Sequence, residues 1–185
     1  MNWLTKLRRT FVGWTKAEAR AYVQLRDKRT QEPEKIIKAV QYAAFKWSLS
    51  RRDKQDLTSL WHAGLSNLQA GIRAGIRGTC SIDAVKLTYL FKSLERSCTP
   101  VTLYYQRPES GGGLGRWGAH ALCVVGLFTT YYWVDIRTSC PQAYATDWFS
   151  QQYGVKFWTE GEYNAILDRQ NEQEEIAFLE SRMKK

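Results

Sequence analysis

Cysteine is scarce in this chain, and its few copies are scattered. Four cysteines occur among 185 residues, and no two of them form a C-x-x-C pair: Cys80, Cys98, Cys123 and Cys140. Structural zinc sites are usually built from such pairs, so we expect no metal site, and nothing else in the sequence implies a cofactor. Of the only two histidines, His62 lies in a helical pattern beside Trp61, where a structural role is expected.

Long hydrophobic runs are also absent. No apolar stretch approaches membrane-spanning length, so we expect no membrane span. The first six residues lead into no long apolar stretch, so we expect no secretory signal, a cytoplasmic or virion-associated protein, and reduced thiols. Hydrophobic residues make up 44% of the chain and charged residues 24%, which is typical of a globular domain rather than a disordered one.

Acidic residues are few in the first part of the chain. Residues 1–78 contain 16 lysines and arginines against 6 acidic residues, a net charge of +10, whereas residues 79–185 have a net charge of −1. Such an excess of positive charge is informative about the binding partners of the protein rather than about its fold. The basic helices offer phosphate contacts but no nucleic-acid motif, and charge runs are usually solvated. We therefore rank nucleic acid below the acidic C-terminal helix of this chain or of a neighbouring one as the neutralising partner.

Helical patterns dominate residues 1–78. Thr15 and Glu18 form a capping-box pattern before a helix over 16–26. Pro33 suits the first turn of a second helix, whose apolar residues recur at helical spacing through Trp47. A third helix is expected from about Asp53 to residue 68.

The remaining residues mix helices with strands. We expect a helix over 81–94, strands over 101–106, 120–125 and 131–136, a flexible loop over 108–118, and helices over 144–153 and from 162 to the end, the last with Ile166, Ile176 and Leu179 as apolar contacts. Helices followed by a meander of strands predict an α+β fold with an antiparallel sheet. We expect three parts: a basic helical segment at 1–74, a core at 75–160, and an acidic helix at 161–185.

Three residues carry the chemistry that this order suggests. Cys80 lies at a helix start, where the macrodipole favours the thiolate, and His120 and Asp135 lie on successive strands. An imidazole can take the proton of a thiol, and a carboxylate can hold the imidazole in the required tautomer. A two-residue connection at Leu127 and Phe128 would set His120 directly opposite Asp135.

Each of these residues also has a plainer interpretation. A single cysteine is most often a small buried hydrophobe, as we expect for Cys123. A single histidine at a strand start is most often a surface group or a satisfied core group. Asp135 could simply cap a turn before Arg137. Only the ordered combination of the three favours catalysis.

The same residues resemble a known family. Gly78, Cys80 and Ala84 before a helix, His120 and Val124 in a strand, and then Trp133, Val134 and Asp135 resemble the transglutaminase-like cysteine peptidase superfamily, most closely its bacterial and phage proteinase branch. The resemblance covers residues 75–137. It implies a papain-like α+β core, with Cys80 as nucleophile, His120 as base and Asp135 as the residue that orients the base.

Further residues are weaker candidates for the same site. Trp61, Asn67 and Gln69 are candidates for the side chain of an oxyanion hole, and the backbone N–H of Cys80 could supply another donor. Arg116 and Trp117, in the loop before His120, could line a substrate groove as part of a mobile flap.

The sequence therefore predicts a hydrolase or acyltransferase that acts on amide or isopeptide bonds of a protein or peptide through a thioester. The alternative is a non-catalytic protein of the same fold that joins an assembly, such as a virion, through its basic N-terminal helices.

Overall fold

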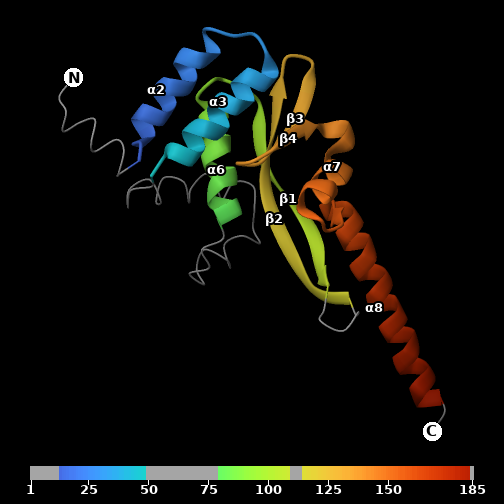
Figure 1. Ribbon diagram of the computed structural model, residues 1–185. Coiled ribbons are helices and arrows are strands. Elements are labelled where there is room, and N and C mark those ends of the chain that lie inside the picture. Colours follow the sequence, from blue (N-terminus) through green and yellow to red (C-terminus); the bar gives the residue numbers. More distant parts are fainter. Residues whose placement is uncertain (1–12, 49–78, 109–113, 184–185) are drawn as a thin grey trace. The chain divides into compact units, whose positions relative to one another are not determined.

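The computed structural model describes residues 13–48, 79–108 and 114–183 (Figure 1). Their helices are α2 (Lys16–Asp27), α3 (Pro33–Lys46), α6 (Thr79–Lys92), the short 3₁₀ helix Gln142–Tyr144, α7 (Ala145–Tyr153) and α8 (Glu160–Met183). Their strands are β1 (Cys98–Pro108), β2 (Leu114–Leu127), β3 (Thr130–Val134), β4 (Ser139–Pro141) and β5 (Phe157–Trp158). The strands form an antiparallel sheet in the order β4-β3-β2-β1-β5, so the predicted α+β class with an antiparallel sheet is confirmed.

The chain divides into two compact units. The first comprises Met1–Val101 and Ala121–Ala145, and the second comprises Thr102–His120 and Thr146–Lys185. Helices α2, α3 and α6 belong to the first unit with the hairpin of β2 and β3. Most of β1 belongs to the second unit, with β5 and α8. The third helix expected near Asp53 lies outside the described residues.

Local sequence signals place the starts of α2 and α3 as predicted. Thr15 caps α2, because its hydroxyl accepts the N–H of Glu18 at 3.2 Å while the Glu18 carboxylate accepts the N–H of Thr15 at 2.9 Å. Pro33 occupies the first turn of α3, where the missing N–H of proline leaves no hydrogen bond unmade. Both helices therefore begin where short-range chemistry alone would begin them.

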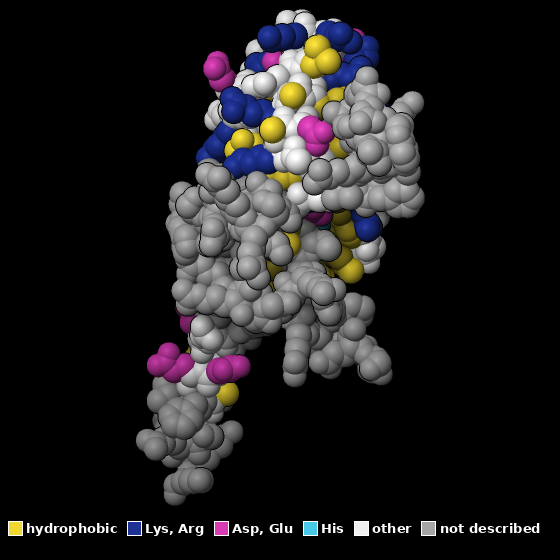
Figure 2. All heavy atoms as spheres, turned by 90° about the vertical axis from the view of Figure 1, so that its left-hand side faces the viewer, with side chains coloured by type: hydrophobic (Ala, Val, Ile, Leu, Met, Phe, Trp, Pro, Cys, Tyr) yellow, Lys and Arg dark blue, Asp and Glu magenta, His cyan; other side chains and the backbone are white. Residues whose placement is uncertain are grey.

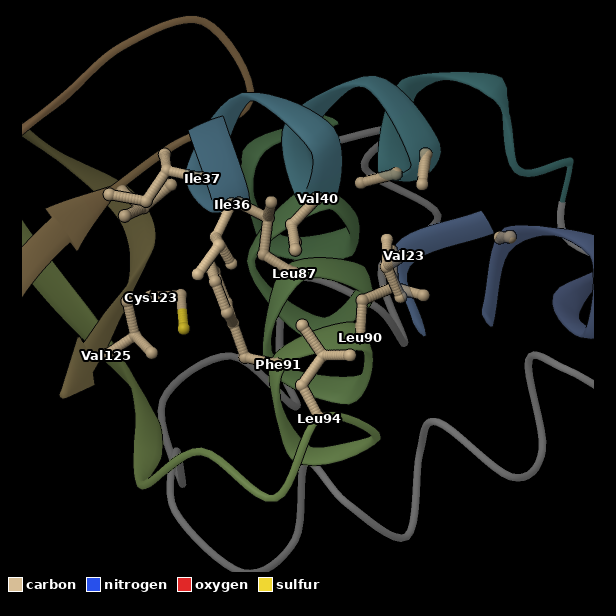
Figure 3. Close-up of a cluster of buried hydrophobic side chains, with 14 of the residues drawn as sticks. Val23, Ile36, Ile37, Val40, Leu87, Leu90, Phe91, Leu94, Cys123 and Val125 are labelled. Atoms are coloured by element: carbon tan, nitrogen blue, oxygen red, sulfur yellow. The ribbon is translucent and has the colours of Figure 1, made fainter. Parts of the chain in front are cut away.

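The three helices of the first unit share one hydrophobic core, which Figure 3 shows. Side chains from all three helices meet there with side chains from the end of β2: Val23, Ile36, Ile37, Val40, Leu87, Leu90, Phe91, Leu94, Cys123 and Val125. Full burial of each large apolar side chain contributes about 1.5–3 kcal/mol, so this core holds the helices against the strands. The apolar residues that recur at helical spacing in the sequence of α3 are the residues that this helix buries.

The β2–β3 hairpin corrects one prediction. Its register pairs Leu127 with Thr130 and Cys123 with Val134, so the turn residues are Phe128 and Thr129. The predicted pairing of His120 with Asp135 is therefore wrong by two residues, and β3 ends before Asp135. The reason is burial, since Leu127 is fully buried while Phe128, at a positive φ of 54°, is about half exposed in the turn.

The hairpin is held further by a close backbone approach at Gly126. The N–H of Gly126 donates to the carbonyl of Ser97 at 2.8 Å, which joins the end of β2 to the residue before β1. A Cβ added at Gly126 would lie 3.2 Å from the ring of Tyr131. The contact therefore favours glycine at this position in the observed register.

The second unit is built on aromatic contacts. Tyr104 of β1 pairs with Trp158 of β5 in the ladder, and its ring stacks on Tyr163 of α8 at 4.0 Å between centroids. Beyond Tyr163, helix α8 has little cover. No side chain from Glu160 to Ala177 is buried, and Ile176, predicted as an apolar contact of this helix, is exposed. That prediction is wrong within the chain, because no described element covers this face of α8.

Candidate functional site

Cys80 is the second residue of α6. Its side chain is a half-buried thiol that forms no disulfide. The predicted helix start is confirmed, because α6 begins at Thr79. The first turn of a helix has N–H groups without intrahelical partners, and such a position favours an anionic sulfur. The placement meets the first requirement of a cysteine nucleophile.

The other three thiols differ from one another in their electrostatics. Burial raises the pKa of the Cys140 thiol to about 11, and the charge of Asp135 adds to this effect. The hydrogen bond between Cys98 and Cys123 lowers the pKa of Cys98, with a smaller contribution from Lys92, and raises the pKa of Cys123 well above its ordinary value. Cys98 is therefore the thiol that competes with Cys80 for electrophiles.

His120 lies in β2, at the end of a segment of the second unit. Within that unit its ring centroid lies 5.0 Å from Tyr153, 5.9 Å from Phe157 and 6.3 Å from Phe149. These rings form an aromatic wall beside the imidazole. The wall could not be predicted from the sequence, because α7 and β5 reach His120 only through the fold.

Asp135 follows β3 directly and is almost fully buried, with 3% of its surface exposed. Its Oδ1 accepts the backbone N–H groups of Arg137 and Thr138, both at 2.7 Å. This is the turn-capping role that the sequence left open as the plainer interpretation. The same two bonds also fix the direction of the carboxyl group.

Gln41 of α3 braces this turn and was not identified from the sequence. Its Nε2 donates to the carbonyl of Asp135 at 2.8 Å and to that of Thr138 at 3.0 Å. Asp135 donates its own N–H to the carbonyl of Thr138 at 3.0 Å. One amide side chain thus ties the turn to a core helix. A glutamine beside apolar helix positions is the only sequence signal for it, and that signal is weak.

Part of the predicted flap is a strand. Residues 114–118, which were predicted to be part of a loop over 108–118, belong to β2, so Arg116 and Trp117 are strand residues. Trp117 packs edge-on against Trp158 at 5.3 Å and Tyr163 at 4.8 Å, within the second unit. These ring contacts hold Trp117 within its unit, and its part in a mobile flap stays a prediction. Its place in a substrate groove stays a prediction, as does that of Arg116.

For several predicted site features, the described residues provide no test. Trp61, Asn67 and Gln69, the oxyanion candidates, lie outside the described residues. Cys80 and Asp135 belong to the first unit and His120 to the second, so the joining of the three into one triad stays a prediction.

Two searches of the described residues gave negative results. No group of three or more His, Cys, Asp or Glu side chains there has the arrangement of a metal site. Among the helices of the same residues, none combines the length and the apolar character needed to cross a membrane.

Comparisons of the chain with protein-family models, with curated proteins and with solved structures found no match.

Proposed function

We propose that this protein is a cysteine-dependent hydrolase or acyltransferase acting on amide or isopeptide bonds. Cys80 is the nucleophile, His120 is the general base, and Asp135 orients the imidazole. The protein resembles the transglutaminase-like cysteine peptidases in the order and local setting of these residues. The observation that carries the proposal is the half-buried thiol of Cys80 in the first turn of α6.

The surroundings of the two partners support the same roles. The Asp135 carboxyl group is buried and held by two backbone N–H groups in a turn braced from α3, so its orientation is fixed. A positioned carboxylate is what a catalytic imidazole needs to keep its tautomer. The rings of Phe149, Tyr153 and Phe157 beside His120 exclude water from one side of the imidazole, which strengthens its interactions with charged groups.

The proposed reaction has two halves. His120 takes the proton of the Cys80 thiol, and the sulfur attacks the carbonyl carbon to form a tetrahedral oxyanion. The oxyanion collapses, the C–N bond breaks, and the leaving amine takes the proton from the imidazolium, which leaves a thioester on Cys80. Water or a second amine then attacks the thioester with His120 as base, and the sulfur leaves as the protonated thiol.

The thiol–imidazole pair can be tested without a known substrate. The rate of alkylation by iodoacetamide is measured against pH in a Cys98→Ser background, because Cys98 is the competing thiol, and the labelled residue is mapped. We expect the alkylation rate of Cys80 to have its midpoint at about pH 6.5. His120→Ala should shift this midpoint toward the ordinary thiol pKa of about 8.5. If His120→Ala and the parent chain gave the same profile at Cys80, the proposed pair would be wrong.

Acyl transfer is tested with p-nitrophenyl acetate. We expect a burst of nitrophenolate and one acetyl group on Cys80 by mass spectrometry, and neither in Cys80→Ala. Asp135→Asn is the matched variant for the third residue, since it keeps an oxygen acceptor for the N–H groups of Arg137 and Thr138 but loses the charge. We expect it to fold and to acylate at least about tenfold more slowly, because carboxylate-to-amide changes in such triads disturb the imidazole.

The alternative function is a non-catalytic assembly protein that docks through its basic N-terminal helices. The observation that favours it is the turn-capping role of Asp135, which accounts for this residue without catalysis. Absence of acetylation at Cys80, together with unchanged assembly of Cys80→Ala, would favour this alternative.

A further inference from the structure

A basic cleft lies between the end of α2 and the beginning of α3. Its volume is about 550 Å³, and four cationic side chains line it: Arg26, Arg29, Lys35 and Lys38. Figure 2 shows Lys and Arg side chains gathered over this helical part of the first unit. Arg26 lies in the last turn of α2 and Arg29 follows its end, whereas Lys35 and Lys38 lie one helical turn apart on α3.

The charges of this basic cleft are not balanced within the described residues. Its one carboxylate, Glu32, pairs with Lys35. Neither Arg29 nor Lys38 forms an ion pair with any described side chain, and both are exposed. Several like charges around one hollow raise the local potential, and an anionic partner would lower it. The basic cleft is therefore suited to an extended anion rather than to a neutral peptide.

Helix α8 carries the complementary charge. Asp168, Glu172 and Glu175 are four and three residues apart, so they lie on one face of the helix, and all three are exposed. We call them the acidic row. Like charges at this spacing destabilise a helix unless a cation lies opposite. Arg169 is the single cation between Glu160 and Ala177.

Exposed apolar side chains flank both charged surfaces. Ile176 lies four residues after Glu172, and 56% of its surface is exposed. Leu25 lies four residues before Arg29, and 48% of its surface is exposed. Ile176 thus lies next to the acidic row on α8, and Leu25 is an exposed residue of α2, the helix on one side of the cleft. A nucleic-acid backbone would use the charges and leave both apolar groups in water, whereas a helix can cover them.

We propose that the acidic row of one copy of this chain docks in the basic cleft of a second copy. Helix α8 lies in the cleft as an amphipathic helix lies in a groove, with its carboxylates between the α2 and α3 cations and Ile176 against Leu25. The two surfaces differ, so the contact is heterologous, and repetition of it gives a ring or an open chain of copies. This inference does not rest on the catalytic role of Cys80.

Size-exclusion chromatography with light scattering tests the association. For the wild-type chain we expect an average mass that rises with concentration in about 0.05 M salt and returns to the monomer mass in about 1 M salt, where the screening length is about 3 Å. A monomer mass at every concentration in low salt would overturn the proposal.

Paired charge reversals locate the contact. Arg29→Glu/Lys38→Glu removes the basic cleft's charge, and Asp168→Lys/Glu172→Lys removes that of the acidic row. We expect each variant alone to be monomeric. Arg20→Glu/Lys28→Glu is the matched control, because it reverses two exposed cations that do not line the basic cleft, and it should associate like the wild type.

Mixing the two variants gives the sharpest result. The cleft variant retains an intact acidic row, and the row variant retains an intact cleft, so an equimolar mixture should form heterodimers while each component alone stays monomeric. Failure of the mixture to associate would overturn the heterologous contact. Monomeric wild type that binds a single-stranded oligonucleotide, with loss of that binding in Arg29→Glu/Lys38→Glu, would assign the basic cleft to nucleic acid instead.

Discussion

Helices α6 and α8 have the same backbone conformation but different reasons to be helical. Helix α6 buries one face in the core of the first unit, with Leu87, Leu90 and Phe91 fully buried. Helix α8 is almost twice as long, with 24 residues against 14, yet none of its side chains from Glu160 to Ala177 is buried. Tertiary burial therefore stabilises α6, whereas α8 depends on its own capping, its propensity and any partner.

This difference has a functional meaning. The buried face of α6 fixes the position of Cys80, which is the support that the proposed nucleophile needs. An exposed charged helix serves the opposite purpose, since its surface is available to another molecule. Matched changes in the two helices and their surroundings distinguish these two cases.

The largest expected effect is the loss of a core side chain. Phe91→Ala should lower the free energy of unfolding by about 3–5 kcal/mol, because it removes a fully buried ring and leaves a cavity. Ile176→Ala in α8 should change it by less than about 0.5 kcal/mol. Urea titrations followed by tryptophan fluorescence measure both values. An equal cost for the two variants would mean that α8 is buried by a partner.

The second-largest expected effect is the loss of the Gln41 hydrogen bonds that brace the Asp135 turn. Gln41→Ala should destabilise the protein by about 1–3 kcal/mol, since the carbonyl groups of Asp135 and Thr138 both lose a donor. Gln170→Ala on the exposed surface of α8 is the control and should have almost no effect. The same urea titration compares them. A neutral Gln41→Ala would show that the turn holds its shape without α3.

A pH effect should follow from Lys86 of α6. Burial lowers its pKa below the ordinary value of 10.5, although Asp83 opposes the shift, and its Nζ donates to the carbonyl of Ala44 at 3.2 Å. The unfolded chain then holds this proton to higher pH than the folded chain, so Lys86 makes stability rise as the pH increases from the folded-state pKa toward 10.5, by at most about 1.4 kcal/mol per pH unit.

Lys86→Met should remove this part of the rise, whereas Lys38→Met, at an exposed lysine of α3, should retain it. Thermal unfolding between neutral pH and about pH 10 measures the stability of each variant and of the wild type. The difference between the two stabilities cancels the contributions of the other titrating groups. Parallel pH profiles for the wild type and Lys86→Met would contradict the assigned sign.

The smallest expected effects concern the two capping boxes. Thr15→Ala should destabilise the first unit by about 1 kcal/mol, because α2 is part of its core. The similar pair Thr159 and Glu162 caps α8, with the N–H of Glu162 donating to Thr159 Oγ1 at 3.3 Å. Thr159→Ala should leave global stability unchanged and speed amide hydrogen exchange only in the first turn of α8. Cooperative loss of α2 in Thr159→Ala would contradict this separation.

Much of the secondary structure could be predicted because its signals are local. The capping residues Thr15 and Glu18, Pro33 at a helix start and the apolar spacing of α3 act within a few residues of each other. The extent of β2 was harder to predict. Its glycine-rich beginning looks like a loop, but pairing and the contacts of Trp117 hold residues 114–118 in the strand.

The candidate site could be predicted only in part for the same reason. The start of α6 beside Cys80 is a local property, and the sequence indicates it. The aromatic wall beside His120 and the brace from Gln41 to the Asp135 turn join residues from distant parts of the chain. No spacing along the chain encodes such contacts.

The α+β class, the helix starts, the buried face of α3 and the contrast between a basic N-terminal part and an acidic last helix can be read from the amino-acid sequence alone. Each follows from short-range chemistry or from composition. Only the tertiary structure decided the register of the β2–β3 hairpin, the turn-capping geometry of Asp135 and the exposure of α8. Register depends on whether Leu127 or Phe128 enters the core, and that choice is made by the helices that pack against the strands rather than by the hairpin sequence.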